Sequence, residues 1–335
     1  MAIRPTSVTL RSSGVAFGSR TVPSEKVDAD FGMPAEKLRL RAGIVSVAYA
    51  EADECEVTLG ARAARMALEQ GNLDPGVLDW VIASSETHHA FPSLAAQLHL
   101  AVDARETCGA LDVGGACLGS LHAFAVAKSF IESRQANTVL VVTADVHSRT
   151  LTPGRVAGEF GGLFGDGASA FLIQGKPPTA SQNYFSLQDF FFGCASQLQQ
   201  AIQVSAEPGD RLKVVFDGDA LSRAATARLD QCIQELESRS GVSRSEVVAF
   251  ATHQPNPRLV ALLAKKCGVP LERFPLIVDR RGNLGSTTCA ASLHFALRAT
   301  SLGGTQSRRT IFVASLAPGL LYGGGWLTSA AGLHR

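Results

Sequence analysis

The chain has 335 residues, and its 31 lysine and arginine residues against 30 aspartate and glutamate residues give a formal net charge of +1. Hydrophobic residues make up 46% of it and charged residues 18%, a composition that excludes a disordered chain. The near-neutral balance argues against nucleic acid as the main partner, because a phosphate-binding surface carries a basic excess.

The N-terminal residues MAIRPTSVTLRSSG contain no apolar run, so they do not resemble a secretory signal. No stretch approaches the roughly 20 apolar residues that cross a bilayer. The seven cysteines are scattered and form no C-x-x-C pair, which gives no support for a zinc site or a redox motif. We therefore expect a cytoplasmic protein that binds no membrane, no metal and no resident cofactor.

Patterns of helix, turn and strand follow one another along the chain, in the segments 67–89, 91–102, 109–127, 134–145 and 163–174. Similar patterns return in the same order, in the segments 235–256, 256–269, 275–299, 307–319 and 320–330. The offset is nearly constant, because Val81 precedes Val248 by 167 positions and Leu94 precedes Leu259 by 165. We infer a duplicated α/β unit with halves 1–175 and 176–335, which meet near Gly175-Lys176-Pro177-Pro178.

Two segments, 121–131 (LHAFAVAKSFI) and 290–297 (AASLHFAL), are apolar nearly all round. A helix without a polar face must be buried on every side. One such helix in each half predicts that the two pack together between two sheets, in a layered αβαβα sandwich. Two separate α/β domains joined by a linker would leave each of these helices with one exposed face.

Cys117 follows the strand pattern GALD and the glycines Gly114 and Gly115, at the first turn of the first apolar helix. The glycines permit a tight strand-to-helix turn. A cysteine at a helix start faces unpaired N–H groups and the positive end of the helix dipole, which favours the thiolate. The sequence therefore predicts a nucleophile at Cys117, against the alternative of a small buried residue.

The second half supplies two candidate partners for this cysteine. His253 ends the strand pattern VVAFAT, and Asn283 lies among glycines just before the second apolar helix. In the duplicated register, the Asn283 loop is the counterpart of the Cys117 loop. We expect the packing of the two halves to bring all three side chains together, where they can form a thiolate and bind an oxyanion.

At these residues the sequence resembles the thiolase-like condensing enzymes, most closely the β-ketoacyl-acyl-carrier-protein synthase III branch. The similarity covers nearly the whole chain and is carried by the following motifs: GSRTVPSEKV with LRLRAGI, IASSETHHAFPS, DVGGACLGSLHAF, LFGDGASAFLI, ATHQPNPRL and DRRGNLGSTTCAAS. The resemblance implies the duplicated thiolase-like fold inferred above, a homodimer, and no cofactor beyond acyl thioesters of acyl carrier protein or coenzyme A.

The resemblance also implies roles for individual residues. Cys117 would accept the acyl group, while His253 and Asn283 would hydrogen-bond the thioester carbonyl of the second substrate and stabilise the enolate. Phe91 matches the residue that enters the pocket of the partner subunit. Four further residues match positions that line the entrance for pantetheine or phosphate: Arg41, Arg155, Asn256 and Arg258.

Three departures from the family pattern point to a specialised, secondary-metabolite paralogue. Lys37 occupies the place of a tryptophan that stacks on the adenine of coenzyme A, which favours carrier-protein substrates. Pro318 occupies the place of a glycine that donates a second oxyanion N–H, so either Gly319 takes over that role or the oxyanion hole is weaker. GNLGSTTCAAS carries extra residues, so the floor of the pocket is expected to differ.

A polar cluster of Glu86, His88 and His89 follows another strand pattern. Some relatives that join two long acyl chains use a glutamate of this loop as a base, but Glu86 lies a few residues too early for that role when counted from Phe91 and Cys117. The histidines have no third metal ligand spaced with them, so we expect a solvated loop. Two basic pairs, Lys265-Lys266 and Arg280-Arg281, are candidates to receive an acidic carrier protein.

The predicted function is therefore an acyltransferase that condenses two acyl thioesters through an acyl-Cys117, with a malonyl or β-ketoacyl thioester as the second substrate, in fatty-acid or polyketide-type biosynthesis. Acyl transfer to an alcohol or amine, or hydrolysis, is the nearest alternative. A papain-like protease would also use Cys, His and Asn, but its C-G-[SA]-C-[WY] signature is absent. An inactive partner subunit is disfavoured because all three reactive residues are present.

Overall fold

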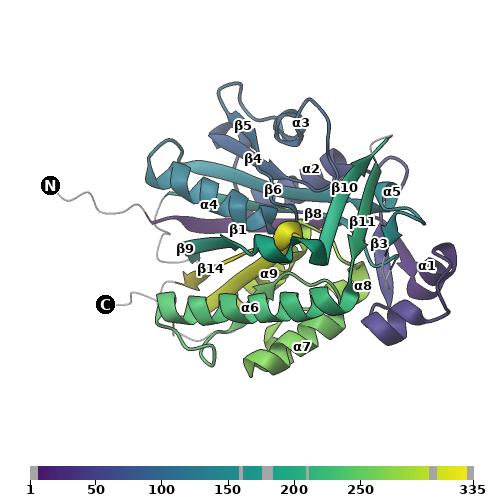
Figure 1. Ribbon diagram of the computed structural model, residues 1–335. Coiled ribbons are helices and arrows are strands. Elements are labelled where there is room, and N and C mark those ends of the chain that lie inside the picture. Colours follow the sequence, from purple (N-terminus) through teal and green to yellow (C-terminus); the bar gives the residue numbers. More distant parts are fainter. Residues whose placement is uncertain (1–6, 158–160, 176–183, 209–210, 302–307, 330–335) are drawn as a thin grey trace.

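Each half of the chain builds one layer of sheet in the computed structural model, which describes residues 7–157, 161–175, 184–208, 211–301 and 308–329 (Figure 1). The strands of the first half lie in the order β5-β4-β6-β8-β1. Their bounds are β1 Thr9–Phe17, β4 Trp80–Ser84, β5 Gly109–Asp112, β6 Thr138–Val146 and β8 Asp166–Gln174. Every residue of β6 is buried, as expected for a β-branched strand that is covered on both faces.

The strands of the second half follow in the order β12-β13-β14-β9. Their bounds are β9 Phe185–Cys194, β12 Ala249–Thr252, β13 Thr310–Ala317 and β14 Leu321–Ser329. A short antiparallel contact joins the two halves, because Thr9 and Leu10 of β1 pair with Ser186 and Phe185 of β9. All nine strands therefore form one hydrogen-bonded sheet that passes from one half to the other.

Helices cover this sheet in three layers. The outer layer of the first half is formed by α2 (Glu56–Gly71) and α3 (Leu94–Ala101), and that of the second half by α6 (Gly218–Ser240) and α7 (Pro257–Cys267). Between the halves lie α4 (Gly119–Glu132) and α9 (Thr287–Ser301), the two helices that were predicted to be buried on every side. The predicted αβαβα sandwich of the thiolase-like fold is confirmed.

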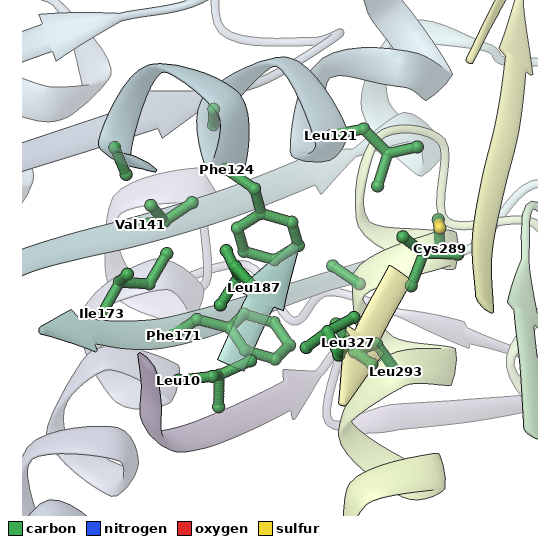
Figure 2. Packing of buried hydrophobic residues seen from close by; sticks show 14 of the residues in the cluster. Leu10, Leu121, Phe124, Val141, Phe171, Ile173, Leu187, Cys289, Leu293 and Leu327 are labelled. Atoms are coloured by element: carbon green, nitrogen blue, oxygen red, sulfur yellow. The ribbon is translucent and has the colours of Figure 1, made fainter. Parts of the chain in front are cut away.

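The central core consists of side chains from both middle helices and both halves of the sheet (Figure 2). Phe124 of α4 meets Phe171 of β8 edge to face, with ring centroids 5.1 Å apart. Leu121 of α4 and Leu293 of α9 are fully or almost fully buried in the same cluster. Each large apolar side chain buried in this way contributes about 1.5 to 3 kcal/mol, so the two halves stabilise each other.

Smaller elements surround one end of the sandwich. They are β2 (Arg20–Pro23), α1 (Ser24–Asp30), the π-helix Leu38–Ala42, β3 (Ser46–Tyr49), α5 (His147–Thr150), β7 (Val156–Ala157), β10 (Ile202–Glu207), β11 (Arg211–Phe216) and α8 (Val278–Arg281). A three-stranded sheet, β10-β11-β7, combines strands from the two halves. The predicted boundary at 175–178 falls mostly on residues 176–183, which lie outside the described residues.

Candidate active site

Cys117 lies between β5 and α4, on the 3-10 turn Ala116–Leu118. Gly115 has a φ of 141°, and a Cβ at this position would lie 2.4 Å from His122 Nδ1, so the turn requires glycine. A Cβ on Gly114 would meet nothing within 4 Å, so this second glycine is not required by space. Ala116 has a φ of 47°, a strained conformation of the kind found at functional turns.

The environment of Cys117 raises the pKa of its thiol well above the usual value, first through burial and then through the nearby Glu86 and Asp145 carboxylates. The prediction that this position favours the thiolate is therefore wrong. Cys117 lies in the 3-10 turn, and α4 begins directly after that turn, at Gly119. These causes disfavour the thiolate of Cys117 while the site is closed to water and holds both carboxylates.

His253 directly follows β12, and its N–H donates to the carbonyl of Ala314 on β13 at 2.9 Å. Its side chain is buried, and burial lowers the pKa of the imidazole to about 4, against the opposing charge of Glu86. The imidazole is therefore neutral near pH 7. It can donate one hydrogen bond from a ring N–H without carrying a charge.

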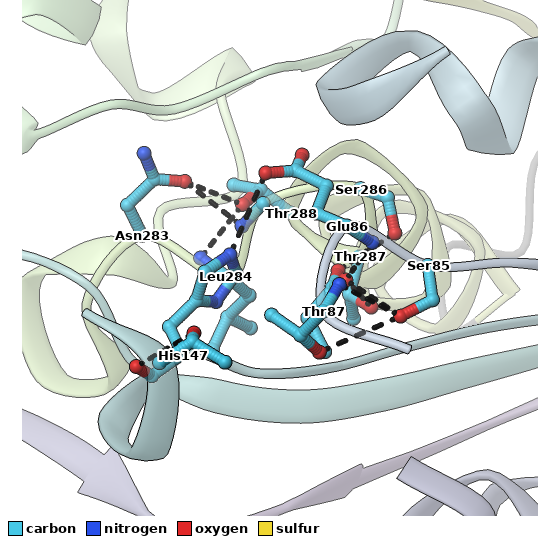
Figure 3. Close-up of polar contacts among 12 residues, drawn as sticks. Ser85, Glu86, Thr87, His147, Asn283, Leu284, Ser286, Thr287 and Thr288 are labelled. Carbon is cyan, nitrogen blue, oxygen red and sulfur yellow. Dashed lines mark hydrogen bonds and ion pairs between the residues drawn. The ribbon is translucent and has the colours of Figure 1, made fainter. Parts of the chain in front are cut away.

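Asn283 lies between α8 and α9, and its own backbone anchors it to the first half: the Asn283 N–H donates to the carbonyl of Leu163 at 2.8 Å. Its Oδ1 accepts hydrogen bonds from the N–H of Gly285 and the hydroxyl of Thr288, both at 3.1 Å (Figure 3). These two contacts fix which way the carboxamide points. They leave its NH₂ group as the donor available to the cavity that Asn283 lines.

Cys117, His253 and Asn283 line one cavity of about 730 Å³ between the two halves. Ser315 of β13 fastens the cysteine turn to the second half, since its hydroxyl donates to the Cys117 carbonyl at 2.6 Å. The structure thus brings together the three side chains that the duplicated register placed on facing loops. A nucleophile beside two neutral hydrogen-bond donors can form a thioester and hold the oxygen of an enolate.

Glu86 lines the same cavity, which the sequence analysis did not anticipate. Its N–H donates to Asp145 Oδ1 at 2.6 Å, and the hydroxyl of Ser85 accepts the next two N–H groups, of Thr87 at 3.1 Å and His88 at 3.0 Å. The loop therefore turns back on itself at the end of β4. The expectation of a solvated loop is wrong at Glu86, because its side chain is only 13% exposed. The role as a base for an α-proton, for which the count placed Glu86 too early, stays a prediction.

Comparison with known proteins identifies the fold and the family. Family models for 3-oxoacyl-[acyl-carrier-protein] synthase III and for its C-terminal part match residues 111–189 and 238–328. The β-ketoacyl-[acyl-carrier-protein] synthase III of Haemophilus ducreyi is 31% identical over 301 residues, which cover 88% of this chain and 89% of that protein. That of Methylococcus capsulatus is 29% identical over 284 residues, 84% and 87% of the two chains. The chain belongs to the β-ketoacyl-[acyl-carrier-protein] synthase III family.

Solved structures agree with this assignment. The priming β-ketosynthase from the R1128 polyketide biosynthetic pathway superposes with a TM-score of 0.83 and 26% identity, covering 98% of each chain. The 3-oxoacyl-[acyl-carrier-protein] synthase III of Aquifex aeolicus superposes with a TM-score of 0.83 and 23% identity, covering 96% of this chain and 99% of that one. The predicted resemblance is confirmed. The protease alternative is wrong, because a synthase III is a transferase that condenses acyl thioesters.

Three of the residues predicted to bind substrate in this synthase III chain lie at the cavity. Arg41, Asn256 and Arg258 all line it. Asn256 also caps α7, because its Oδ1 accepts from the N–H of Leu259 at 2.9 Å. Arg258 donates to the carbonyl of Leu40, which holds the guanidinium close to the π-helix that carries Arg41.

The other three predicted substrate residues lie elsewhere. The side chain of Arg155 forms an ion pair with Glu207 of β10, and Arg155 is not among the residues that line the cavity. Phe91 is 94% exposed on the surface of the single chain. Gly319 adopts a left-handed φ of 82° outside the cavity lining, whereas Pro318 lines the cavity.

The remainder of the cavity is mostly apolar and is formed by elements that the sequence analysis did not connect with the site. The β10–β11 hairpin contributes Val204 and Val214, and the start of α6 contributes Leu221. Within the described residues there is no group of three or more potential metal ligands and no helix that is long and apolar enough to span a membrane. The cavity thus has mainly apolar walls around a few polar side chains, an arrangement that suits acyl thioesters.

Proposed function

We propose that this enzyme forms a carbon–carbon bond between two acyl thioesters in fatty-acid or polyketide-type biosynthesis. The observation that carries the proposal is the presence of the buried Cys117, His253 and Asn283 in one cavity of a synthase III fold. The Cys117 sulfur attacks the thioester of the first substrate, and the carrier thiol leaves. The acyl group then remains on Cys117 as a thioester.

The second step consumes a malonyl thioester. Loss of CO₂ leaves an electron pair on the adjacent carbon, which delocalises onto the thioester oxygen as an enolate. The neutral imidazole of His253 and the NH₂ of Asn283 donate hydrogen bonds to this oxygen. The enolate carbon attacks the acyl carbonyl, the bond to the Cys117 sulfur breaks, and a proton from solvent restores the thiol.

Carrier proteins, and not coenzyme A, are the substrates that we propose. Lys37 occupies a position where a stacking tryptophan is expected for coenzyme A. Arg41 and Arg258, which line the cavity, can attract the acidic surface or the phosphate of a carrier arm. All seven cysteines are free, which is in keeping with the reducing cytoplasm where such carriers act.

Intact-mass measurement tests the proposal. Wild-type enzyme incubated with an acyl carrier protein should gain the mass of one acyl group, and subsequent malonyl carrier should release a β-ketoacyl product. Cys117→Ala should gain no mass, whereas Cys194→Ser, which removes an exposed thiol, should behave as wild type. Absence of an adduct on wild type, or an adduct that persists in C117A, refutes the acyl-enzyme. Release of free acid or of an ester in place of the β-ketoacyl product refutes condensation.

We also propose a homodimer, as the family resemblance implies, in which Phe91, 94% exposed on the single chain, is buried against a second copy. Phe91→Ala should weaken the dimer in sedimentation velocity experiments and slow acylation. Leu271→Ala, a substitution of a 41% exposed residue of the second half, is the matched control and should leave the dimer intact. A dimer of unchanged stability in F91A would refute the assignment of this side chain to the interface.

A further inference from the structure

Among the titratable side chains of the cavity that have no part in the scheme above, Glu86 and His147 form a buried pair. Glu86 follows β4 and His147 follows β6, and these two strands pair in parallel, so their carboxyl ends place both residues at the same edge of the sheet. Glu86 Oε2 lies 3.5 Å from His147 Nε2. Buried charges of this kind are costly unless they are paired, so their place at the nucleophile needs a reason.

The pair is held from several sides. His147 Nδ1 lies 3.0 Å from the Gly165 carbonyl, which can only accept, so Nδ1 carries a proton and Nε2 is the nitrogen that faces Glu86. Gly285 of the Asn283 loop packs directly against the pair: a Cβ there would lie 2.8 Å from Glu86 Cδ and 2.6 Å from His147 Cε1. A side chain at position 285 would therefore displace the pair. The close packing of Gly285 holds the Glu86 carboxylate in place relative to the other polar groups of the site.

The charge state of the pair follows from its surroundings. Burial alone would lower the pKa of His147, but its hydrogen bond to Glu86 and the charges of Asp145, Glu86 and Asp166 raise it to about 9. Burial alone would raise the pKa of Glu86, but the hydrogen bond and charge of His147 lower it. Near neutral pH the pair is therefore an imidazolium and a carboxylate.

Glu86 also interacts with the nucleophile. Cys117 and Glu86 line the same cavity, and the charge of the Glu86 carboxylate helps to raise the pKa of the Cys117 thiol. The buried Oε1 of Glu86 has no hydrogen-bond partner among the described residues. Catalytic hydrogen bonds are often long before substrate binds. The thiol therefore shares the cavity with a carboxylate oxygen, Glu86 Oε1, that accepts no hydrogen bond from any other described residue.

We propose that Glu86 is a catalytic residue that accepts the Cys117 proton as the acyl-enzyme forms, and that His147 is the residue that positions its carboxylate. The inference rests on the proposed function. As the sulfur bonds to the thioester carbon, its proton passes to Glu86 Oε1. When the carbon–sulfur bond to the carrier breaks, the same proton passes to the leaving thiolate, which regenerates the carboxylate without net proton uptake.

His253 is a poorer acceptor for this proton. Transfer from Cys117 to His253 would create two new charges, a thiolate and an imidazolium, inside a buried site. Transfer to Glu86 only moves one negative charge from oxygen to sulfur, while the His147 imidazolium remains to balance it. The structure thus separates proton transfer by Glu86 from enolate binding by His253.

The test compares acylation with condensation in one variant. Glu86→Gln keeps the size and hydrogen-bonding capacity of the side chain but cannot take the proton. Its acylation rate near pH 7.5, measured by rapid mixing with acyl carrier protein and intact mass, should fall on the order of 100-fold and should recover as pH rises and the thiolate forms without help. Condensation from enzyme that is already acylated should stay within about threefold of wild type.

Two further variants keep the result interpretable. Glu56→Gln makes the same change at a residue that contacts Thr87 but does not line the cavity, so it should acylate normally. His147→Asn keeps a donor for the Gly165 carbonyl but removes the cation. It should shift the acidic limb of the acylation profile to higher pH, because Glu86 then holds its proton more tightly. Four titratable groups surround the Glu86 carboxylate and contribute to the pH dependence of acylation: Cys117, His147, Asp145 and His253.

The outcomes separate the two proposals. If wild type acylates and E86Q acylates equally fast, Glu86 is not the acceptor. If E86Q acylates normally and only condensation is lost, the carboxylate acts on the second substrate, which also overturns the inference. Should E86Q fold poorly, Glu86→Asp replaces it, and partial retention of acylation is the expected result. Absence of any acyl-enzyme on wild type would instead refute the proposed function.

Discussion

The hydrogen bonds of Asn283 make its enolate-binding role directly testable. In Asn283→Asp, the oxygen that accepts from Gly285 and Thr288, each at 3.1 Å, is retained. The loop and the start of α9 should therefore keep their structure. Only the NH₂ changes: a hydrogen-bond donor becomes an acceptor that carries a negative charge. The substitution isolates one donor, whereas truncation would leave two buried donors without a partner.

The expected magnitude follows from this geometry. Loss of one preorganised oxyanion donor lowers the rate by about 10² to 10³, or about 3 to 4 kcal/mol. Because Asn283 is only 5% exposed, the new charge is weakly screened and places the result at the upper end of that range. Condensation should therefore be about 10³ slower.

The assay starts from enzyme already acylated on Cys117, which removes any effect of the substitution on the thiol. Malonyl carrier protein is added by rapid mixing, and the β-ketoacyl product is followed by mass. Asn72→Asp, a change at the left-handed C-cap of α2 and outside the cavity lining, serves as the control and should condense at the wild-type rate. A fall of less than about threefold in N283D would show that this carboxamide does not bind the enolate.

Two further predictions concern stability. Gly119→Ala should destabilise the fold by about 1 to 3 kcal/mol in urea, because its Cβ would lie 2.0 Å from Ser84 Oγ, and Ser84→Ala should restore part of the loss. Acid should also destabilise the fold: burial lowers the pKa of His253 and His294 to about 4, so the unfolded state takes up protons first as pH falls below 6.5. Each histidine then lowers the free energy of unfolding by about 3 kcal/mol by pH 4. Burial raises the pKa of Asp145 to about 7, so this group takes up its proton first in the folded state and offsets the loss from roughly one histidine. Thermal melts from pH 7 to pH 4 should therefore show a net loss, and a constant melting temperature would contradict these pKa values.

The layers of the fold were predictable because they depend on local patterns that recur. The mostly apolar run of β6 and the largely apolar surfaces of α4 and α9 are visible in the sequence, and the same register in both halves leaves few ways to pack them. The pairing of Cys117 with the second half follows from that symmetry. One departure from symmetry was not predictable: in the described residues, α8 occupies the place in the second half that β5 occupies in the first.

Residues placed by long-range contacts were predicted less well. Arg155 was expected at the substrate entrance, but Glu207 of the β10–β11 hairpin holds its guanidinium, and β7 pairs with β11 across the two halves. Nothing in the sequence around Arg155 indicates this pairing. The apolar wall formed by the same hairpin was missed for the same reason, since β10 and β11 have no counterpart in the duplicated pattern.

Glu86 shows how counting along a chain can fail at a functional loop. A count of positions from Phe91 and Cys117 gives no place in space, whereas Ser85 and Asp145 together accept three successive N–H groups and turn the loop so that Glu86 lines the cavity. The same fold that brings this carboxylate to the sulfur raises the pKa of the thiol, so one arrangement accounts for both errors about the site. A helix start can ionise a cysteine when the surroundings are otherwise neutral. In this enzyme the buried carboxylates reverse that tendency, and the cysteine is therefore expected to depend on a neighbouring base.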